Sequence, residues 1–199
     1  MIHPTCVIGE PPQDKSQDQK SGTDRSKIKI GKRNVIREYT CIHAPTQKET
    51  VIGNDNFIMT HCVVNHDCRI FNHCVLSSGV KLGGFCTVDS YANLGMNACV
   101  HQGVVIGAFT MIGMGAAVTK HVPPFCLLNP KYDVVRKINV VGMTRNGFSA
   151  ADVDAVTAYY AGRLQLSQVP AEPRWFIQQF HALAEVAPIK RATYEVRFC

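Results

Sequence analysis

The residues that most clearly point to chemistry in this chain are a histidine and the carboxylate that follows it, His66 and Asp67. A carboxylate can hold an imidazole in one tautomer, which makes it a competent general base near neutral pH. Gly84 follows His66 by eighteen residues, and His101 and Gln102 come about eighteen residues later again. A glycine N–H can stabilise a developing oxyanion. These residue types predict a base-catalysed reaction that passes through an oxyanion.

The spacing of eighteen matters because the chain has a repeat of six residues. A strand has a side-chain period of two and a helix one of 3.6, so a period of six fits neither. The pattern predicts a β-solenoid in which each hexad forms one flat side and three hexads close a triangular coil. An aliphatic residue stands at every sixth position in the series Ile52, Ile58, Val64, Ile70, Leu76, Leu82, Val88, Leu94, Val100, Ile106, Ile112 and Val118.

In such a solenoid, residues eighteen apart stack at the strand spacing of roughly 4.8 Å. His66 is then expected above Gly84 and Gln102, on the same edge of the prism as His101, about 10 Å away along the axis. A single histidine at a solenoid corner is normally a solvated side chain without a function. The neighbouring Asp67, the glycine and the second polar pair favour a catalytic role here.

The repeat also predicts the domain organisation. The phase is present at Ile2 and Ile8 and ends near Val122, so we expect the solenoid over residues 1–124. Two polar interruptions, 10–28 and 44–51, are predicted to be loops that leave the prism at a corner.

Residues 125–199 are predicted to be a linker followed by a helical region. Ser149 and Asp152 form a capping signal that opens a helix over 150–166, and a second helix is expected over 175–186. The resulting helical hairpin should cover one flank of the prism.

The nine cysteines do not indicate a disulfide framework or a zinc site, since no CxxC pair occurs. Five of them occupy the small inward position of the repeat and are interpreted as compact apolar fillers: Cys6, Cys62, Cys68, Cys74 and Cys86. So many free thiols favour a reducing, cytoplasmic compartment.

The formal net charge of +6 suits an acidic partner, such as a carrier protein or a phosphorylated substrate. No stacking aromatics interleave the basic residues, so nucleic acid is not an expected partner. No apolar run reaches the length of a membrane span.

Several motifs together resemble the UDP-N-acetylglucosamine O-acyltransferase family of hexapeptide-repeat enzymes. The resemblance runs in order from about Ile8 to the end of the chain. The motifs that carry it are Pro12–Asp14, Gly31–Glu38, Asn65–Cys68, Val100–Gln102, Val122–Phe125 and Asn139–Phe148.

The resemblance implies a homotrimer of left-handed parallel β-helices with a C-terminal α-helical appendage and active sites between subunits. His66 would deprotonate the 3-hydroxyl of UDP-N-acetylglucosamine for attack on an acyl-carrier-protein thioester, the first step of lipid A synthesis. Asp67 would orient His66, and the Gly84 amide would stabilise the oxyanion. The acyl group is expected to be a 3-hydroxyacyl chain. No metal or cofactor is implied.

The resemblance also implies the substrate contacts. The sugar would meet Asp14, with Gln13 beside it, and Met114 would limit the acyl chain to a shorter length. The nucleotide and its phosphates would be held by His101, Gln102, Asn139 and Arg145.

Some positions depart from the family pattern. Val63 and Phe85 stand where the family has histidine, Val141 replaces a glutamate, Asn146 an arginine and Ser16 a lysine. Each lost charge-assisted hydrogen bond costs roughly 1.5–3 kcal/mol, so we expect weaker substrate binding or an altered acceptor.

Two alternatives remain open on the sequence. His61 and His66 have the ligand spacing of hexapeptide-fold carbonic anhydrases, which would need a third imidazole such as His43, His73 or His101 from a partner. The other alternative is a non-catalytic trimeric scaffold that binds acyl-carrier protein or nucleotide.

Overall fold

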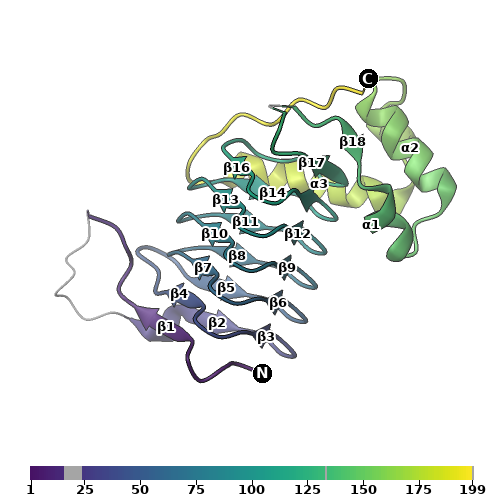
Figure 1. Cartoon of the computed structure of the whole chain (residues 1–199). Coiled ribbons are helices and arrows are strands. Elements are labelled where there is room, and N and C mark those ends of the chain that lie inside the picture. The colour runs from purple at the N-terminus through teal and green to yellow at the C-terminus, as the bar shows by residue number, and fades with distance from the viewer. Residues whose placement is uncertain (16–23, 133, 199) are drawn as a thin grey trace.

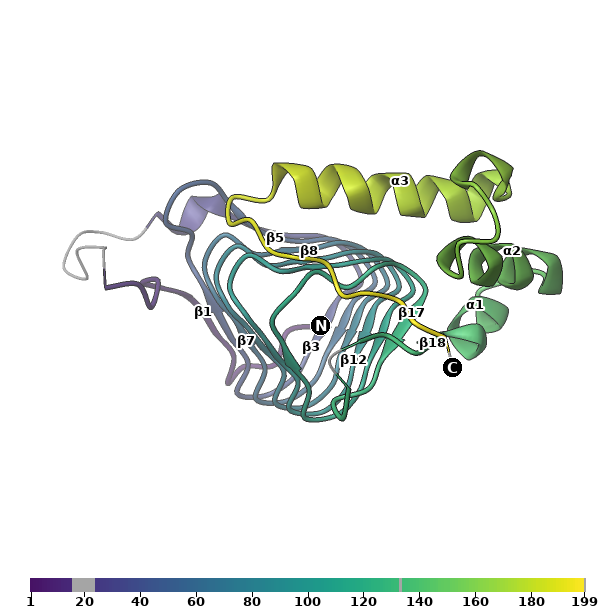
Figure 2. The same cartoon turned by 90° about the horizontal axis from the view of Figure 1, so that it is seen from above.

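The computed structural model describes residues 1–15, 24–132 and 134–198 of the 199-residue chain. Three parallel sheets form the sides of a triangular prism, here named sheets A, B and C (Figures 1 and 2). Viewed from above in Figure 2, the chain passes clockwise from sheet A to sheet B to sheet C while it rises toward the viewer. This path is left-handed. The predicted fold, a left-handed parallel β-helix of hexapeptide repeats with a helical appendage, is confirmed.

The strands are short, because each side of the prism is only one hexad wide. Sheet A contains β3 (Val35–Ile36), β6 (Phe57–Ile58), β9 (Val75–Leu76), β12 (Asn93–Leu94), β15 (Met111–Ile112), β17 (Cys126–Leu128) and β18 (Lys137–Ile138). Sheet B contains β1 (Val7–Glu10), β4 (Cys41–His43), β7 (Val63–Val64), β10 (Lys81–Leu82), β13 (Cys99–Val100) and β16 (Ala117–Val118). Sheet C contains β2 (Ile28–Ile30), β5 (Thr50–Ile52), β8 (Arg69–Ile70), β11 (Thr87–Val88) and β14 (Val105–Ile106).

The inside of the prism is filled as the repeat predicts. Leu82 pairs in register with Val64 below and Val100 above, so residues eighteen apart stack directly. Aliphatic side chains from Ile52 to Val118 are buried, and so are the smaller fillers such as Cys62 and Cys74. Burial raises the pKa of the Cys62 thiol to about 11 and that of Cys74 to about 12, which makes both thiols chemically inert fillers.

Most corners of the prism turn through a residue with positive φ. Non-glycine residues rarely adopt this conformation, and aspartate and histidine are enriched among those that do. At the corner between sheets B and C, Asp67 has φ 58° and Phe85 has φ 60°. The turn at this B–C corner therefore fixes the backbone of the residue that follows His66.

The prism continues beyond residue 124, where the sequence predicts only a linker. β17 pairs with β15 and adds one more strand to sheet A, because Leu128 again points inward and is buried. β18 then pairs with β17 in the antiparallel direction. The prediction of a linker between residue 124 and the first predicted helix is wrong for these strands and for the short helix α1 (Val140–Arg145).

Two longer helices follow. α2 (Ala150–Tyr160) has the predicted capping box between Ser149 and Asp152 but ends six residues earlier than predicted. A 3-10 turn at Leu166–Gln168 precedes α3 (Ala171–Val186), which begins four residues before the predicted start. Pro173 lies in the first turn of α3, where the missing proline N–H costs nothing.

The helices cover only part of the prism. Figure 2 shows α3 lying along sheet C, and α1 and α2 beside the corner between sheets C and A. After α3, residues 187–198, here called the C-terminal strap, run back across the last coil. They form bridges between His121 and Thr193 and between Val135 and Val196. Within the described ranges, no helix is long and apolar enough to cross a membrane.

Candidate active site at the B–C corner

The His66 ring packs directly against Gly84 of the next coil, as the repeat predicts. A Cβ atom added to Gly84 would lie 2.3 Å from Cε1 of His66 and 2.4 Å from its Nε2. Phe85 meets the same imidazole edge-on, with 5.1 Å between ring centroids. The ring is thus held from above by a position where no side chain larger than hydrogen fits, and from the side by an aromatic ring.

The imidazole is also oriented by its neighbouring carboxylate. Nδ1 of His66 lies 3.0 Å from Oδ2 of Asp67, and the two side chains are only 6% and 2% exposed. An ionised carboxylate can only accept, so Nδ1 carries the proton and Nε2 of the neutral ring has a free lone pair. No side chain or backbone group in the described part of the chain bonds Nε2, and this atom retains some accessible surface. The geometry is that of a general base whose only reactive atom is Nε2.

Asp67 is held in place by the loop that precedes β5. Its Oδ2 accepts hydrogen bonds from the Thr46 amide and hydroxyl, and its Oδ1 accepts from the amides of Gln47 and Lys48. Burial raises the pKa of this carboxyl, but the hydrogen bonds from His66, Lys48 and Thr46 outweigh it and hold the pKa well below its usual range. Asp67 is therefore charged at neutral pH. The repeat alone does not indicate these loop contacts.

The first loop of the chain leaves the prism at the same corner. It connects β1 in sheet B to β2 in sheet C, so Gln13 and Asp14 lie in the part of the loop that leaves the prism at the B–C corner. The His43 ring donates from Nδ1 to the Pro11 carbonyl at 3.0 Å and ties the start of this loop to the prism. Gln13 and Asp14 thus belong to the same edge as His66. Ser16 lies outside the described residues.

His101 and Gln102 complete this edge, one coil above Gly84. His101 is exposed, and its Nδ1 is 2.7 Å from Nη2 of Arg191 in the C-terminal strap. Nε of the same arginine donates to the Gln102 carbonyl at 3.1 Å. Arg191 is a residue of this edge that the sequence does not single out, because it lies some ninety residues away and outside the repeat.

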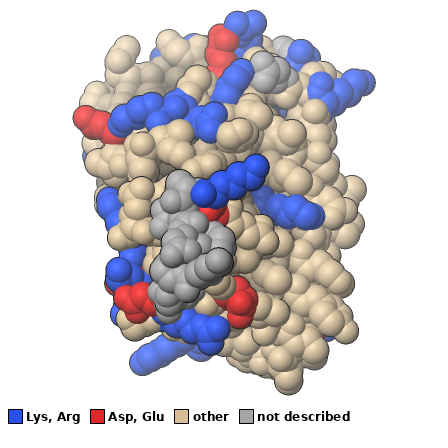
Figure 3. Space-filling view, turned by 90° about the vertical axis from the view of Figure 1, so that its left-hand side faces the viewer, with Lys and Arg blue, Asp and Glu red and all other residues tan. Residues whose placement is uncertain are grey.

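A groove of about 370 Å³ lies beside the His66 corner, between sheet C and the end of α3. Asp67 and Phe85 contribute to one wall, and Leu183 and Pro188 to the opposite one. Figure 3 looks toward this edge and shows more lysine and arginine side chains than acidic ones on this side of the molecule. The edge therefore combines an oriented imidazole, an apolar wall and a predominantly basic surround.

The structure does not bring Asn139 and Arg145 to this edge. Both line a separate cavity of about 600 Å³ on the sheet A side of the molecule, together with Val141 and Asn146. Asn139 caps α1 by accepting from the Gly142 amide at 3.1 Å, and it donates to the Phe109 carbonyl at 2.8 Å. Arg145 is exposed and forms no ion pair with any described carboxylate. In one chain, the predicted nucleotide contacts are divided between two places.

Met114 lies apart from both places, at the corner between sheets A and B, where its side chain is 62% exposed. Val63, on the outer face of sheet B, is half-buried in β7.

His61 occupies the A–B corner, whereas His66 occupies the B–C corner, so the suggested pair of zinc ligands does not converge within one chain. Among the residues that the structure describes, no three His, Cys, Asp or Glu side chains gather as a metal site.

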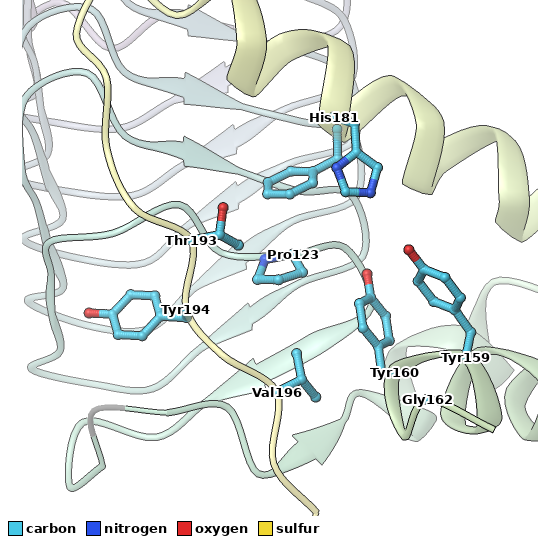
Figure 4. A pocket seen from close by; sticks show the side chains of 9 residues that line it. Pro123, Tyr159, Tyr160, Gly162, His181, Thr193, Tyr194 and Val196 are labelled. Carbon is cyan, nitrogen blue, oxygen red and sulfur yellow. The ribbon is translucent and has the colours of Figure 1, made fainter. Parts of the chain in front are cut away.

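Another cavity, of about 350 Å³, lies between α2, α3 and the C-terminal strap (Figure 4). It is lined by Tyr159 and Tyr160 of α2, His181 of α3 and Tyr194 of the strap. The Tyr160 hydroxyl donates to the Pro124 carbonyl at 3.1 Å. None of the predicted site residues lines this cavity, and it marks the joint between appendage and prism.

Sequence comparisons support this architecture. A profile of the bacterial transferase hexapeptide repeat matches residues 49–84, and one described as UDP-N-acetylglucosamine O-acyltransferase, domain 2, matches residues 121–173. A curated relative, the acyl-[acyl-carrier-protein]–UDP-N-acetylglucosamine O-acyltransferase of Burkholderia orbicola, is 37% identical over 161 residues. The match covers 79% of this chain and 60% of that protein, so the chain spans about three fifths of the relative's length.

Solved structures give the same result over most of the fold. The UDP-N-acetylglucosamine acyltransferase of Francisella novicida superposes with a TM-score of 0.83 at 26% identity, covering 97% of this chain and 73% of that one. A further crystal structure of a UDP-N-acetylglucosamine acyltransferase superposes with a TM-score of 0.79 at 30% identity, covering 97% and 78%. With the repeat, the helical appendage and both profiles in agreement, the chain belongs to the UDP-N-acetylglucosamine acyltransferase family.

Proposed function

We propose that this chain transfers a 3-hydroxyacyl group from acyl-carrier protein to the 3-hydroxyl of UDP-N-acetylglucosamine, the first step of lipid A synthesis. The observation that carries the proposal is the His66–Asp67 pair on Gly84, with Nε2 as the one free nitrogen of an oriented ring. The names of the related proteins supply the two substrates.

In this reaction, Nε2 of His66 takes the proton of the sugar hydroxyl as the oxygen attacks the thioester carbon. The Gly84 N–H, which no described residue accepts, is available for the oxyanion that forms on the carbonyl oxygen. Collapse of this intermediate breaks the C–S bond, and the imidazolium gives its proton to the departing thiolate, which leaves as the free thiol of the carrier protein. Asp67 stabilises the imidazolium, because its own charge is maintained by the Thr46–Lys48 loop.

We further propose a homotrimer, because the outer faces of sheets A and B are mainly apolar, apart from the exposed Lys81 and Lys137, and meet at one corner. The outward side chains of sheet A include Val35, Phe57, Val75, Met111 and Leu127, and those of sheet B include Val7, Cys41, Val63, Cys99 and Ala117. The A–B corner exposes large apolar side chains, Tyr39, Met96 and Met114. A heterologous contact between two different faces closes into a ring, here with sheet A of one chain facing sheet B of the next.

This arrangement would reunite the divided site. If the A–B corners point to the threefold axis, the B–C corner of one chain lies across a cleft from the C–A corner of its neighbour. His66 and His101 would then face Asn139 and Arg145 of the adjacent subunit, and Met114 would lie at the inner end of the cleft. A methionine there would shorten the accepted acyl chain.

The test is a transfer assay with UDP-N-acetylglucosamine and carrier protein loaded with 3-hydroxyacyl chains of several lengths. We expect turnover by the wild type, a loss of at least about a thousandfold in His66→Ala, and a shift toward longer chains in Met114→Gly. His61→Ala, a corner histidine outside the site, is the matched control and should retain activity. Turnover that survives His66→Ala contradicts the proposed base, and a folded trimer without turnover on any UDP-sugar favours a scaffold.

A further inference from the structure

The C-terminal strap places an arginine against the upper part of the candidate site. Arg191 donates from Nη2 to Nδ1 of His101 and from Nε to the carbonyl of Gln102. Ile189 fixes the strap beside it, since a Cβ added to Gly103 would lie 2.5 Å from Cβ of Ile189. The arginine is therefore seated by packing as well as by hydrogen bonds.

The bond to Arg191 determines the chemical state of His101. A guanidinium has only N–H donors, so Nδ1 of His101 must be the acceptor. The remaining proton of the neutral ring is then on Nε2, and an exposed imidazole presents an N–H donor at the edge of the prism. A guanidinium has five N–H groups. The two bonds use two of them, which leaves three for a ligand.

The surroundings of Arg191 are basic. No carboxylate of residues 1–15, 24–132 or 134–198 forms an ion pair with it. Lys190 precedes it, and His121 lies nearby with its Nδ1 accepting from the Val105 amide at 2.9 Å. Burial lowers the pKa of His121, and the charges of Arg191 and Lys190 lower it further. An unpaired guanidinium in such a place is suited to an anion.

The position relative to the base is also suitable. Gln102 stands two coils from His66, which is about 10 Å along the prism axis. The groove of about 370 Å³ is lined by Asp67 and Phe85 next to the base, and by Pro188, three residues before Arg191. A substrate with a phosphate some distance from its reacting carbon or oxygen could thus place one group at each end.

We propose that the C-terminal strap adds Arg191 to the phosphate contact already expected of His101, to form a phosphate subsite: the guanidinium binds the phosphate and holds the histidine as an N–H donor. The identity of the ligand rests on the proposed function. Both substrates carry a phosphate ester: the diphosphate of the UDP-sugar and the phosphodiester of the phosphopantetheine arm on the carrier protein. Arg191 would contact the phosphate directly and also act as a positioning residue for His101.

The experiment compares probes with and without phosphate. Binding of UDP and of 4′-phosphopantetheine, and of uridine and pantetheine as their phosphate-free counterparts, is measured by calorimetry on the full-length chain. We expect Arg191→Gln to weaken one phosphate-bearing probe about tenfold or more and to leave its counterpart unchanged. The probe that is weakened identifies the source of the phosphate. Arg197→Gln is the matched control, because Arg197 is exposed on the same strap and pairs with Glu195.

A second measurement tests whether Arg191 positions the His101 ring or only anchors the strap to the prism. Side-chain ¹⁵N shifts of His101 should report the Nε2–H tautomer in the wild type and a mixture in Arg191→Gln. If that variant does not fold, Arg191→Lys decides the question, since lysine keeps the charge but not the planar fork and should weaken the phosphate probe severalfold.

Three outcomes overturn the proposal: equal affinity of phosphate-bearing probes in wild type and variants, equal weakening of both members of a pair, or no advantage of phosphate in the wild type. Transfer activity is measured alongside. If the wild type turns over substrate but Arg191→Gln binds the probes as the wild type does, the phosphate subsite is refuted while the proposed function stands. If phosphate binding depends on Arg191 but the wild type shows no turnover, the proposed function is refuted while the phosphate subsite stands.

Discussion

The contact between His66 and Gly84 links the stability of the prism to its chemistry at the scale of single residues. The imidazole occupies the space that a Cβ on residue 84 would need. A glycine is required here for lack of space, not for backbone conformation, because its φ is not in the left-handed region. The position is thus specified by the ring stacked on it.

This dependence can be measured with a double-mutant cycle. Gly84→Ala should destabilise the wild type by about 1–3 kcal/mol, because the ring must shift within a packed corner. In a His66→Ala background the same change should cost much less, since the space is empty. Urea unfolding of the four proteins gives the coupling energy. A cycle in which the two changes are additive contradicts the proposed packing.

What the sequence could predict at this scale is limited to residues within the repeat. The register of eighteen stacks His66 against Gly84 and in line with Gln102 two coils away, and a single sequence is enough to derive it. The amides of Thr46, Gln47 and Lys48 that hold Asp67 belong to an aperiodic loop, where no pattern reports backbone direction.

At the scale of elements, α3 is attached to the prism by a buried carboxylate. Gln179 of α3 donates to both oxygens of Asp89, at 2.7 and 2.8 Å, across sheet C. Burial raises the pKa of Asp89 above its ordinary value, and the hydrogen bonds from Ser90 and Gln179 lower it by less. The charged form is therefore disfavoured in the folded protein.

The pH dependence follows from the direction of this shift. A carboxyl whose pKa is raised on folding contributes stability that is complete below its unfolded value, about 3.8, and lost as the pH rises through the folded value. Asp89→Asn should therefore increase stability at pH 7, on the order of 1 kcal/mol, and flatten its decline above pH 4. Gln179→Ala should have the opposite effect at pH 7, because it leaves the charge without its donor. Thermal unfolding from pH 4 to 8 checks both, and a decrease in Asp89→Asn at pH 7 contradicts the argument.

The elements themselves were predictable to different degrees. The strands up to β16 follow from period six, and α2 follows from its capping box. β17 and β18 do not, because Pro123 and Pro124 interrupt the repeat while the chain still fills one more layer. The course of the C-terminal strap could not be predicted from the sequence either, because it is set by contacts with His121 and Val135, which are far away in the sequence.

At the scale of the whole molecule, the mainly apolar outer faces of sheets A and B are uncovered in the single chain, and the proposed trimer covers both. Ala117 of β16 is exposed on sheet B in the single chain. Ala151 is also exposed, but on α2, away from these faces. The two alanines therefore offer a matched pair for testing assembly.

We expect Ala117→Arg to shift the chain from trimer to monomer in sedimentation velocity and to abolish transfer, because the proposed site takes Arg145 from the neighbour. Ala151→Arg should leave the trimer and the activity unchanged. Circular dichroism should be the same for both variants, since neither position lies inside the prism. A monomeric wild type, or a fully active monomeric variant, contradicts the shared cleft.

The stack of rings along the C–A corner gives the molecule an internal optical reporter. His73, Tyr91, Phe109 and Phe125 lie face to face, and Phe176 of α3 meets the last two edge-on. Beside Phe176 is Trp175, the only tryptophan of the chain. Its emission therefore senses whether the appendage is seated, and comparing its melting curve with that of far-ultraviolet dichroism, to which helices and hexad layers both contribute, tests without a label whether the two parts unfold together.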